Sequence, residues 1–173
     1  IERKGLLERT TAKFLDEHVP LLEASELGQR KPPLFRVRRT NGHEAVLWKN
    51  GSRHGIVAAT EKAGHGGTID LVQKDEAFAD VDARMEQGLQ PTMATRPEPQ
   101  FWITSTAGTP ESTYLWGKVE AGRARVESQE PSRTAYFEWS APDDMDPGDP
   151  ATWRAIHPAL GFTIDQSAIE FAF

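Results

Sequence analysis

Two adjacent carboxylates, Asp75 and Glu76, follow a stretch at 68–74 that is typical of a β-strand. A second such stretch, at 100–105, leads into three hydroxyl-bearing residues, Thr104, Ser105 and Thr106. In open α/β sheets, ligands bind beyond the carboxyl ends of the strands. The spacing between the two stretches fits one strand–helix–strand unit, so we expect the carboxylates and the hydroxyls to share one edge of a sheet.

Carboxylates in this position suit the chemistry of phosphoryl transfer. One can support Mg²⁺ through its water shell, because magnesium gives up its waters reluctantly. The other can orient and deprotonate an attacking water. We assign Asp75 to magnesium and Glu76 to water, and the hydroxyls of 104–106 can hydrogen-bond a phosphate or a water.

An isolated Asp-Glu pair is also common on exposed loops, so the pair alone is weak support for catalysis. Gln73 and Lys74 are polar where a central strand should be apolar on both faces. Lys74 could extend to solvent, pair with Asp75, or mark the edge of the sheet.

Composition indicates an ordinary globular chain of one domain, with 173 residues and a formal net charge of −6. The absence of cysteine excludes disulfides and Cys-based zinc sites. No apolar run approaches the ~18 residues that span a bilayer, and no signal peptide is recognisable, so we expect a cytoplasmic protein. The first residue is Ile1, and we expect a chain that was trimmed or cut from something longer.

In the first part of the chain, apolar spacing predicts a helix from residue 5 to about 26, with Pro20 ending or kinking it near Val19. Three strands are predicted at 34–39, 44–49 and 53–59. Asn50-Gly51 joins the last two as a hairpin, because both residues tolerate positive φ.

Further elements alternate between helix and strand. Helices are predicted at 80–87, limited by Pro91, and at 111–121, with Gly122 just past its end. A strand is predicted at 134–139, and Asp149 should cap a short helix that begins at Pro150. These patterns predict an α/β fold whose sheet is mainly parallel, with the hairpin as an antiparallel edge.

Two other groups could bind ligands. Arg96, between the two strands of the candidate site, could contact a nucleotide phosphate or a neighbouring subunit. His43, His54 and His65 are evenly spaced, but no structural period underlies that spacing, so a metal site there is not expected.

Several motifs together resemble one family. They are Asp75-Glu76-Ala77-Phe78, the run 93–97 leading into 101–108, the run 135–140, and the run from Asp149-Pro150 to Gly161. In this combination the chain resembles the large terminase subunit of tailed bacteriophages. The resemblance covers most of the chain and departs from the family pattern at His157, where an Asn is usual.

The resemblance implies a partial P-loop NTPase-type sheet. It implies an ATPase domain at 1–140, with 141–173 leading towards a nuclease domain beyond the chain. Asp75-Glu76 would be the Walker B motif, Thr104-Ser105-Thr106 the coupling motif, and ATP and Mg²⁺ the cofactors. The family's Walker A loop, G-x-x-x-x-G-K-[ST], does not occur in these residues.

The family also implies a function and partners. The function would be ATP hydrolysis coupled to translocation of double-stranded DNA into a procapsid, in the bacterial cytoplasm. The partners would be the portal protein, the small terminase subunit and other copies in a ring. Without a phosphate-binding loop, we expect this chain alone not to hydrolyse ATP at a useful rate.

Two alternatives remain open. The chain could be a non-catalytic interaction module on the same fold, such as a truncated prophage product. It could instead be an unrelated α/β phosphohydrolase that uses Asp75 and Glu76 for metal.

Overall fold

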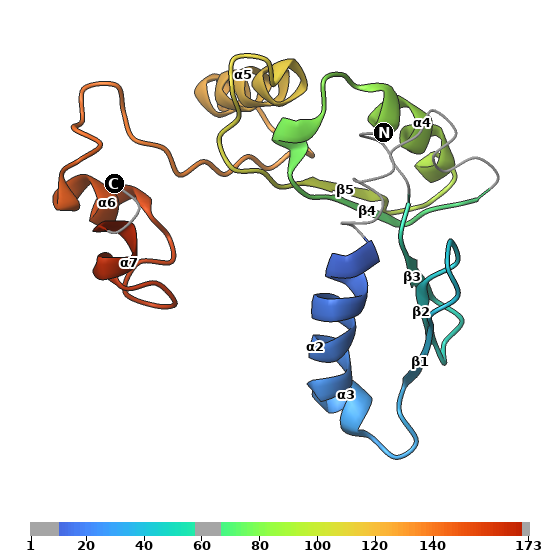
Figure 1. Ribbon diagram of the computed structural model, residues 1–173. Helices are drawn as coiled ribbons and strands as arrows, with labels where there is room; N and C mark the ends of the chain where they lie inside the picture. Colours follow the sequence, from blue (N-terminus) through green and yellow to red (C-terminus); the bar gives the residue numbers. More distant parts are fainter. Residues whose placement is uncertain (1–10, 58–66, 171–173) are drawn as a thin grey trace. The chain divides into compact units, whose positions relative to one another are not determined.

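The computed structural model describes residues 11–57 and 67–170 of the chain. Two units, Ile1–Trp116 and Gly117–Phe173, are distinguished by their internal contacts, and each is described by itself. The first holds two small sheets and their helices, and the second holds the helices that follow (Figure 1).

The N-terminal helical segment consists of a π-helical turn, η1 (Phe14–His18), followed by α2 (Val19–Ala24) and α3 (Glu26–Gln29). Pro20 does not end the helix, which continues from the π-helical turn directly into α2. Just before it, the Val19 N–H donates to the Phe14 carbonyl five residues back, which gives the π geometry. The helix therefore passes the proline by changing its winding.

Strands β1 (Phe35–Arg38), β2 (Ala45–Trp48) and β3 (Arg53–Gly55) form a three-stranded antiparallel sheet in that order. The predicted Asn50-Gly51 turn joins β2 to β3, with Gly51 at φ +88° and the Asn50 Oδ1 accepting from the Ser52 N–H at 3.0 Å. All three predicted strands are present, but the third ends at Gly55, earlier than predicted. The predicted positions 58 and 59 lie outside the described part of the chain.

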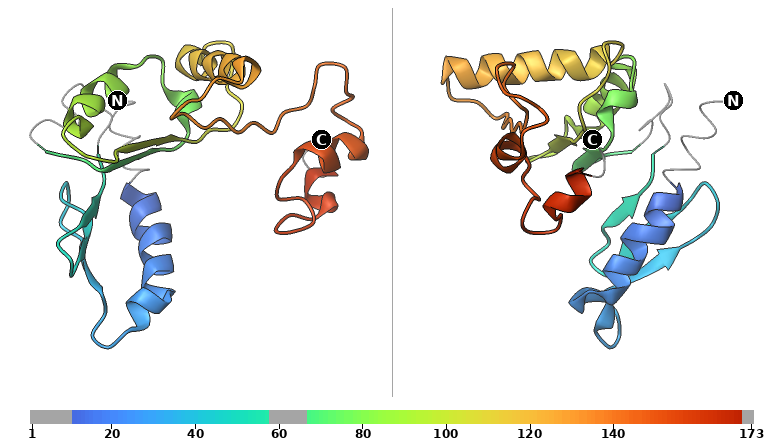
Figure 2. Two further views of the ribbon diagram at one scale, coloured as in Figure 1. Left: turned by 180° about the vertical axis from the view of Figure 1, so that it is seen from behind. Right: turned by 60° about the vertical axis from the view of Figure 1, so that its left-hand side comes forward.

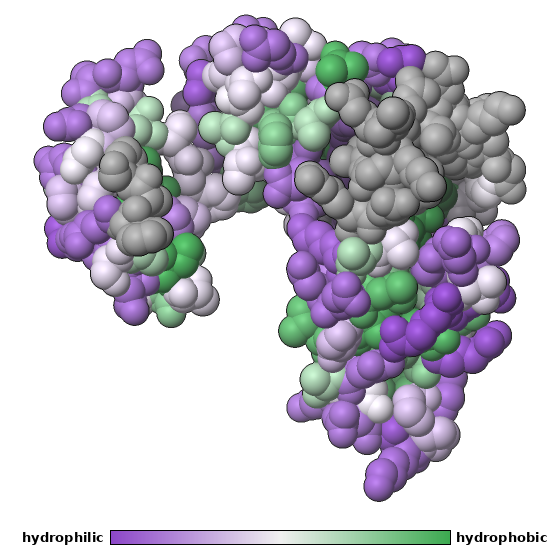
Figure 3. All heavy atoms as spheres, in the orientation of Figure 1, coloured by the Kyte–Doolittle hydropathy of each residue, from purple (hydrophilic) through white to green (hydrophobic). Residues whose placement is uncertain are grey.

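A hydrophobic cluster joins this sheet to the N-terminal helix. Four buried residues form it: Phe14, Val19, Phe35 and Val46. The views in Figure 2 show the helix running alongside the three strands. Hydrophobic residues are visible between helix and sheet in Figure 3.

Strands β4 (Leu71–Lys74) and β5 (Gln100–Ile103) pair in parallel, with Leu71 opposite Gln100 and Lys74 opposite Ile103. Helix α4 (Arg84–Met93) connects them and packs on one face through Leu89 and Met93. The prediction of an α/β fold is confirmed. The hairpin does not extend this sheet, however, because β1–β3 form a sheet of their own.

The predicted helix at 80–87 is placed wrongly. A 3-10 turn, η2 (Ala77–Ala79), follows the strand, and α4 begins only at Arg84. It also continues through Pro91, which lies in its last turn and so loses only one backbone bond.

Helix α5 (Thr113–Ser128) begins in the first unit and continues into the second. It runs well past the predicted end, and Gly122 is a buried position inside it. A Cβ at Gly122 would come within 2.2 Å of the Tyr136 ring. The glycine therefore allows the segment after the helix to fold back onto it.

The predicted strand at 134–139 is not present as a strand. Its sequence favours one, but no neighbouring strand pairs with it among the described residues. Side chains hold it to α5 instead, since Arg123 binds Glu138 at 2.5 and 3.0 Å. Beyond it come α6 (Pro150–Ile156), where the Asp149 side chain caps the Ala151 N–H at 2.8 Å as predicted, and α7 (Gln166–Glu170).

Candidate functional site

The carboxyl ends of β4 and β5 stay connected beyond the strands themselves. The Thr104 N–H donates to the Lys74 carbonyl at 2.9 Å, and the Ala77 N–H donates to the Thr104 carbonyl at 3.2 Å. These two bonds place Asp75 and Glu76 beside Thr104. The sequence-predicted juxtaposition of acids and hydroxyls is therefore present in the structure.

The Asp75 carboxylate is held by a hydrogen bond on each oxygen. Oδ1 accepts from the Thr104 hydroxyl at 2.8 Å, and Oδ2 lies 2.6 Å from the Lys13 ammonium. These bonds, first from Lys13 and then from Thr104, lower the pKa of Asp75 below its ordinary value. Just over half of its side-chain surface remains exposed, so the carboxylate is both charged and accessible.

Glu76 occupies the left-handed backbone region, with φ +57° and ψ +44°. A residue with a Cβ is disfavoured there, and such positions cluster at functional sites. This conformation turns the chain from β4 into η2 within one residue. Glu76 therefore stands at the point where the chain leaves β4.

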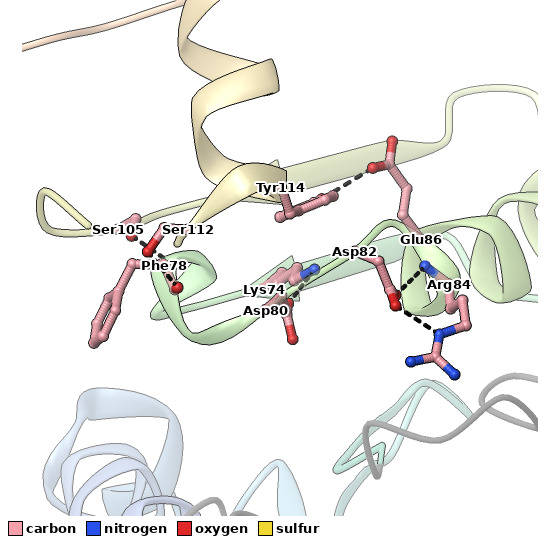
Figure 4. A network of polar contacts seen from close by, with 9 residues as sticks. All are labelled: Lys74, Phe78, Asp80, Asp82, Arg84, Glu86, Ser105, Ser112 and Tyr114. Atoms are coloured by element: carbon pink, nitrogen blue, oxygen red, sulfur yellow. Dashed lines mark hydrogen bonds and ion pairs between the residues drawn. The ribbon is translucent and has the colours of Figure 1, made fainter. Parts of the chain in front are cut away.

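Two serines link the loop after β4 to the loop after β5. The Phe78 N–H donates to Ser105 Oγ at 3.0 Å, and the Ser105 hydroxyl donates to the Thr106 carbonyl at 2.8 Å. The Ser112 hydroxyl donates to the Phe78 carbonyl at 2.9 Å (Figure 4). Ser105 thus holds the two loops together in this structure. The coupling role expected for Thr104, Ser105 and Thr106 stays a prediction.

Lys74 is buried on the covered face of the sheet, facing away from Asp75. Its ammonium forms an ion pair with Asp80 and lies 3.7 Å from the centre of the Tyr114 ring. The Tyr114 hydroxyl donates to the Glu86 carboxylate at 2.9 Å (Figure 4). Burial beside that carboxylate raises the pKa of Tyr114.

Two of the sequence-based alternatives for Lys74, exposure to solvent and a pair with Asp75, are therefore wrong. The third is confirmed, because β4 is an edge strand of a two-stranded sheet. The strand alternation gave the one available signal, because residues two apart face the same side and Val72 is a core residue. Sequence reasoning missed Asp80, Glu86, Ser112 and Tyr114, whose roles depend on contacts between distant parts of the chain.

Arg96 is not brought to this edge. Its Nε lies 3.1 Å from Asp70 Oδ1, just before β4 begins. Five residues of extended chain separate Asp70 from Asp75, which corresponds to roughly 16 Å. The placement gives no support to a phosphate contact by Arg96 at the same site.

The predicted absence of a histidine metal site is not tested for His65, which lies outside the described residues. His54 stacks on His18 and meets Phe14 edge-on. Its burial, and then the charge of His18, lower the pKa of His54. Within 11–57 and 67–170, no three His, Cys, Asp or Glu residues gather closely enough to hold a metal ion.

The oxygen groups at the strand ends nevertheless fit Mg²⁺. This ion commonly uses one or two carboxylates and fills its other positions with water and substrate phosphates. The accessible Asp75 carboxylate, aligned by Thr104 and followed by Glu76, supplies that set.

No helix among the described residues is long and apolar enough to cross a membrane.

Comparison with solved structures shows a similarity in fold. The fold is similar to that in the crystal structure of the HK97 bacteriophage large terminase, with a TM-score of 0.73 and 16% sequence identity. The match covers 93% of this chain and 32% of that chain, so the described fold corresponds to about a third of the terminase. No family model and no curated protein matches the sequence.

Proposed function

We propose that this chain is part of an ATPase of the large-terminase type, and that the carboxyl ends of β4 and β5 form its Mg²⁺–ATP edge. The observation that carries the proposal is the Asp75–Thr104 hydrogen bond of 2.8 Å, which joins the acid of one strand to the hydroxyl of the next. The similarity in fold to a phage large terminase supports the same assignment.

Each residue would have a distinct task. Asp75 would hold Mg²⁺ through a water, and Thr104 would keep its carboxylate in a fixed orientation. Glu76 would orient the attacking water and accept its proton. Mg²⁺, when bound, would neutralise charge on the phosphates, and positioning of this kind accounts for most of the catalysis in phosphoryl transfer.

The phosphates need a further contact that these residues do not provide. No Walker A sequence occurs in the chain, so the proposal places the phosphate-binding loop elsewhere in the functional protein. The proposed task is translocation of double-stranded DNA in the bacterial cytoplasm. Portal protein, the small terminase subunit and further copies of the motor subunit are the proposed partners.

A hydrolysis assay with and without double-stranded DNA tests this function. It should use a longer polypeptide in which a phosphate-binding loop precedes these residues. We expect DNA to stimulate Mg²⁺-dependent ATP hydrolysis, and D75N to reduce both the basal and the stimulated rate. An ATP hydrolysis rate that DNA does not raise would favour a phosphohydrolase with no translocating role. Full activity of D75N would refute the assignment of the Mg²⁺–ATP site to this edge of the sheet.

A further inference from the structure

The ion pair between Lys13 and Asp75 brings a cation to the candidate metal site. Lys13 directly precedes η1, far from β4 in the sequence, and its ammonium lies 2.6 Å from Asp75 Oδ2. Thr104 already occupies the other oxygen, Oδ1, with its hydroxyl. Lys13 therefore sits on the carboxylate oxygen that is left for another partner.

We propose that Lys13 is a resident counter-ion that a divalent cation must displace from Asp75, so that Lys13 lowers the affinity of this site for metal. The inference rests on the proposed function, because it takes Asp75 to be the metal-holding carboxylate. It adds a regulating residue to that site.

Geometry and charge both favour competition. An ammonium at 2.6 Å leaves no room for a hydrated cation on the same side of Oδ2. A second positive charge beside the first would also be repelled, and this repulsion is only partly screened at short range. One of the two cations must therefore leave.

The surroundings of Lys13 explain why it stays in place without metal. The hydrogen bond and charge of Asp75, with smaller contributions from Glu17 and Glu76, raise the pKa of the Lys13 ammonium. Both partners remain partly exposed, at 44% for Lys13 and 53% for Asp75. Exposed pairs of this kind are weak, so a divalent ion can break the contact.

A purely structural role is the competing explanation. Lys13 could serve only to tether the N-terminal helix to the end of β4. Removing the tether would then leave the cation affinity unchanged or lower it, whereas removing a competitor would raise it.

Calorimetric titration of the 173-residue chain with Mn²⁺, a probe for Mg²⁺, separates the two roles. The variants are K13M and K13Q, with K49M as a control for the loss of one positive charge. Lys49 is an exposed lysine whose ammonium contacts only the Pro32 carbonyl in the described structure. D75N and the double variant K13M/D75N identify the binding that depends on Asp75.

We expect K13M and K13Q to bind Mn²⁺ about two- to fivefold more tightly than the unmodified chain, which matches the strength of an exposed ion pair. K49M should bind like the unmodified chain, and K13M/D75N should lose the gain. Unchanged affinity in both Lys13 variants, with binding still lost in D75N, would overturn the counter-ion role and leave the metal site intact. If no variant shows binding that depends on Asp75, the metal assignment itself fails.

Discussion

The two acids of the candidate site differ in the conformational free energy of their backbone. Asp75 directly follows β4, whereas Glu76 lies at φ +57°, where most residues are disfavoured by roughly 1 kcal/mol or more. The chain retains a glutamate there although asparagine would fit better. We infer that the carboxylate of Glu76 serves function at the expense of stability.

Replacing Glu76 by asparagine should therefore stabilise the fold. Asparagine tolerates the left-handed region, so E76N should raise the free energy of unfolding by about 0.5–1 kcal/mol. Glutamine has the same backbone preference as glutamate, which makes E76Q a matched control with little expected change. Urea denaturation followed by tryptophan fluorescence measures both, and an E76N chain less stable than E76Q would contradict the inference.

Individual site residues can be predicted from the sequence where a strand end or a short motif identifies them. Asp75 and Glu76 are recognisable because apolar residues lead into them, and Thr104 because its strand ends in hydroxyls. Lys13 and Tyr114 are not recognisable, since each is defined by a partner far along the chain. Only strand alternation predicts the burial of Lys74, because the charge of a lysine side chain favours exposure to solvent.

Helix α5 contains two glycines, and only one of them is required by the packing around the helix. A Cβ at Gly122 would collide with the Tyr136 ring, whereas a Cβ at Gly117 in the same helix would meet nothing within 4 Å. Alanine is the better helix former by roughly 1 kcal/mol at either site. Only at Gly122 does tertiary packing oppose that preference.

The pair G122A and G117A tests this packing within one helix. G117A should stabilise the chain by about 0.5–1 kcal/mol, and G122A should be about 1–2 kcal/mol less stable than G117A because the segment at Tyr136 must move. Chemical denaturation of both variants gives the difference. Equal stabilisation by the two substitutions would show that Tyr136 does not pack on this helix.

The Arg123–Glu138 pair makes the same contact dependent on pH. Hydrogen bonds from Arg123, Tyr136 and Ser140 lower the pKa of Glu138 to about 2, from an ordinary value of 4.5. A lowered folded-state pKa stabilises the fold fully above about pH 4.5, and this contribution is lost as the pH falls towards 2.

E138Q should therefore be less stable than the unmodified chain at pH 6, by about 1 kcal/mol after allowance for solvent exposure. The gap should narrow as the pH approaches 2. Urea denaturation at pH 6, 4 and 3 measures it, with E130Q as a control on the same stretch of chain. A gap that is constant with pH would mean that the ion pair does not form.

Elements with strong local signals could be predicted from the sequence. The Asn50-Gly51 hairpin and the Asp149 cap are examples, because turn and cap residues act within a few positions. The end of α5 and the segment at 134–139 could not be predicted in the same way. A glycine that permits ring packing looks like a helix stop, and a strand-like segment needs a partner strand that local sequence does not reveal.

On the scale of the whole chain, the sequence predicts the α/β class but not the number of sheets. Antiparallel strands next to a parallel pair suggested one mixed sheet, yet β1–β3 and β4–β5 are separate. Within the first unit, β4–β5 is covered on one face, while Leu71 and Trp102 on the other face stay exposed. Parallel sheets are usually covered on both faces, and no local pattern shows which surface is uncovered.

The central claim is that Glu76 acts in the cleavage of ATP at the joined ends of β4 and β5. Single-turnover cleavage tests it most directly, in the polypeptide that carries a phosphate-binding loop ahead of this chain, with ATP binding measured separately. We predict that E76Q binds ATP as the unmodified protein does and cleaves it about 10²- to 10⁴-fold more slowly, the loss expected when a general base is removed. Cleavage by E76Q at the unmodified rate would contradict the account.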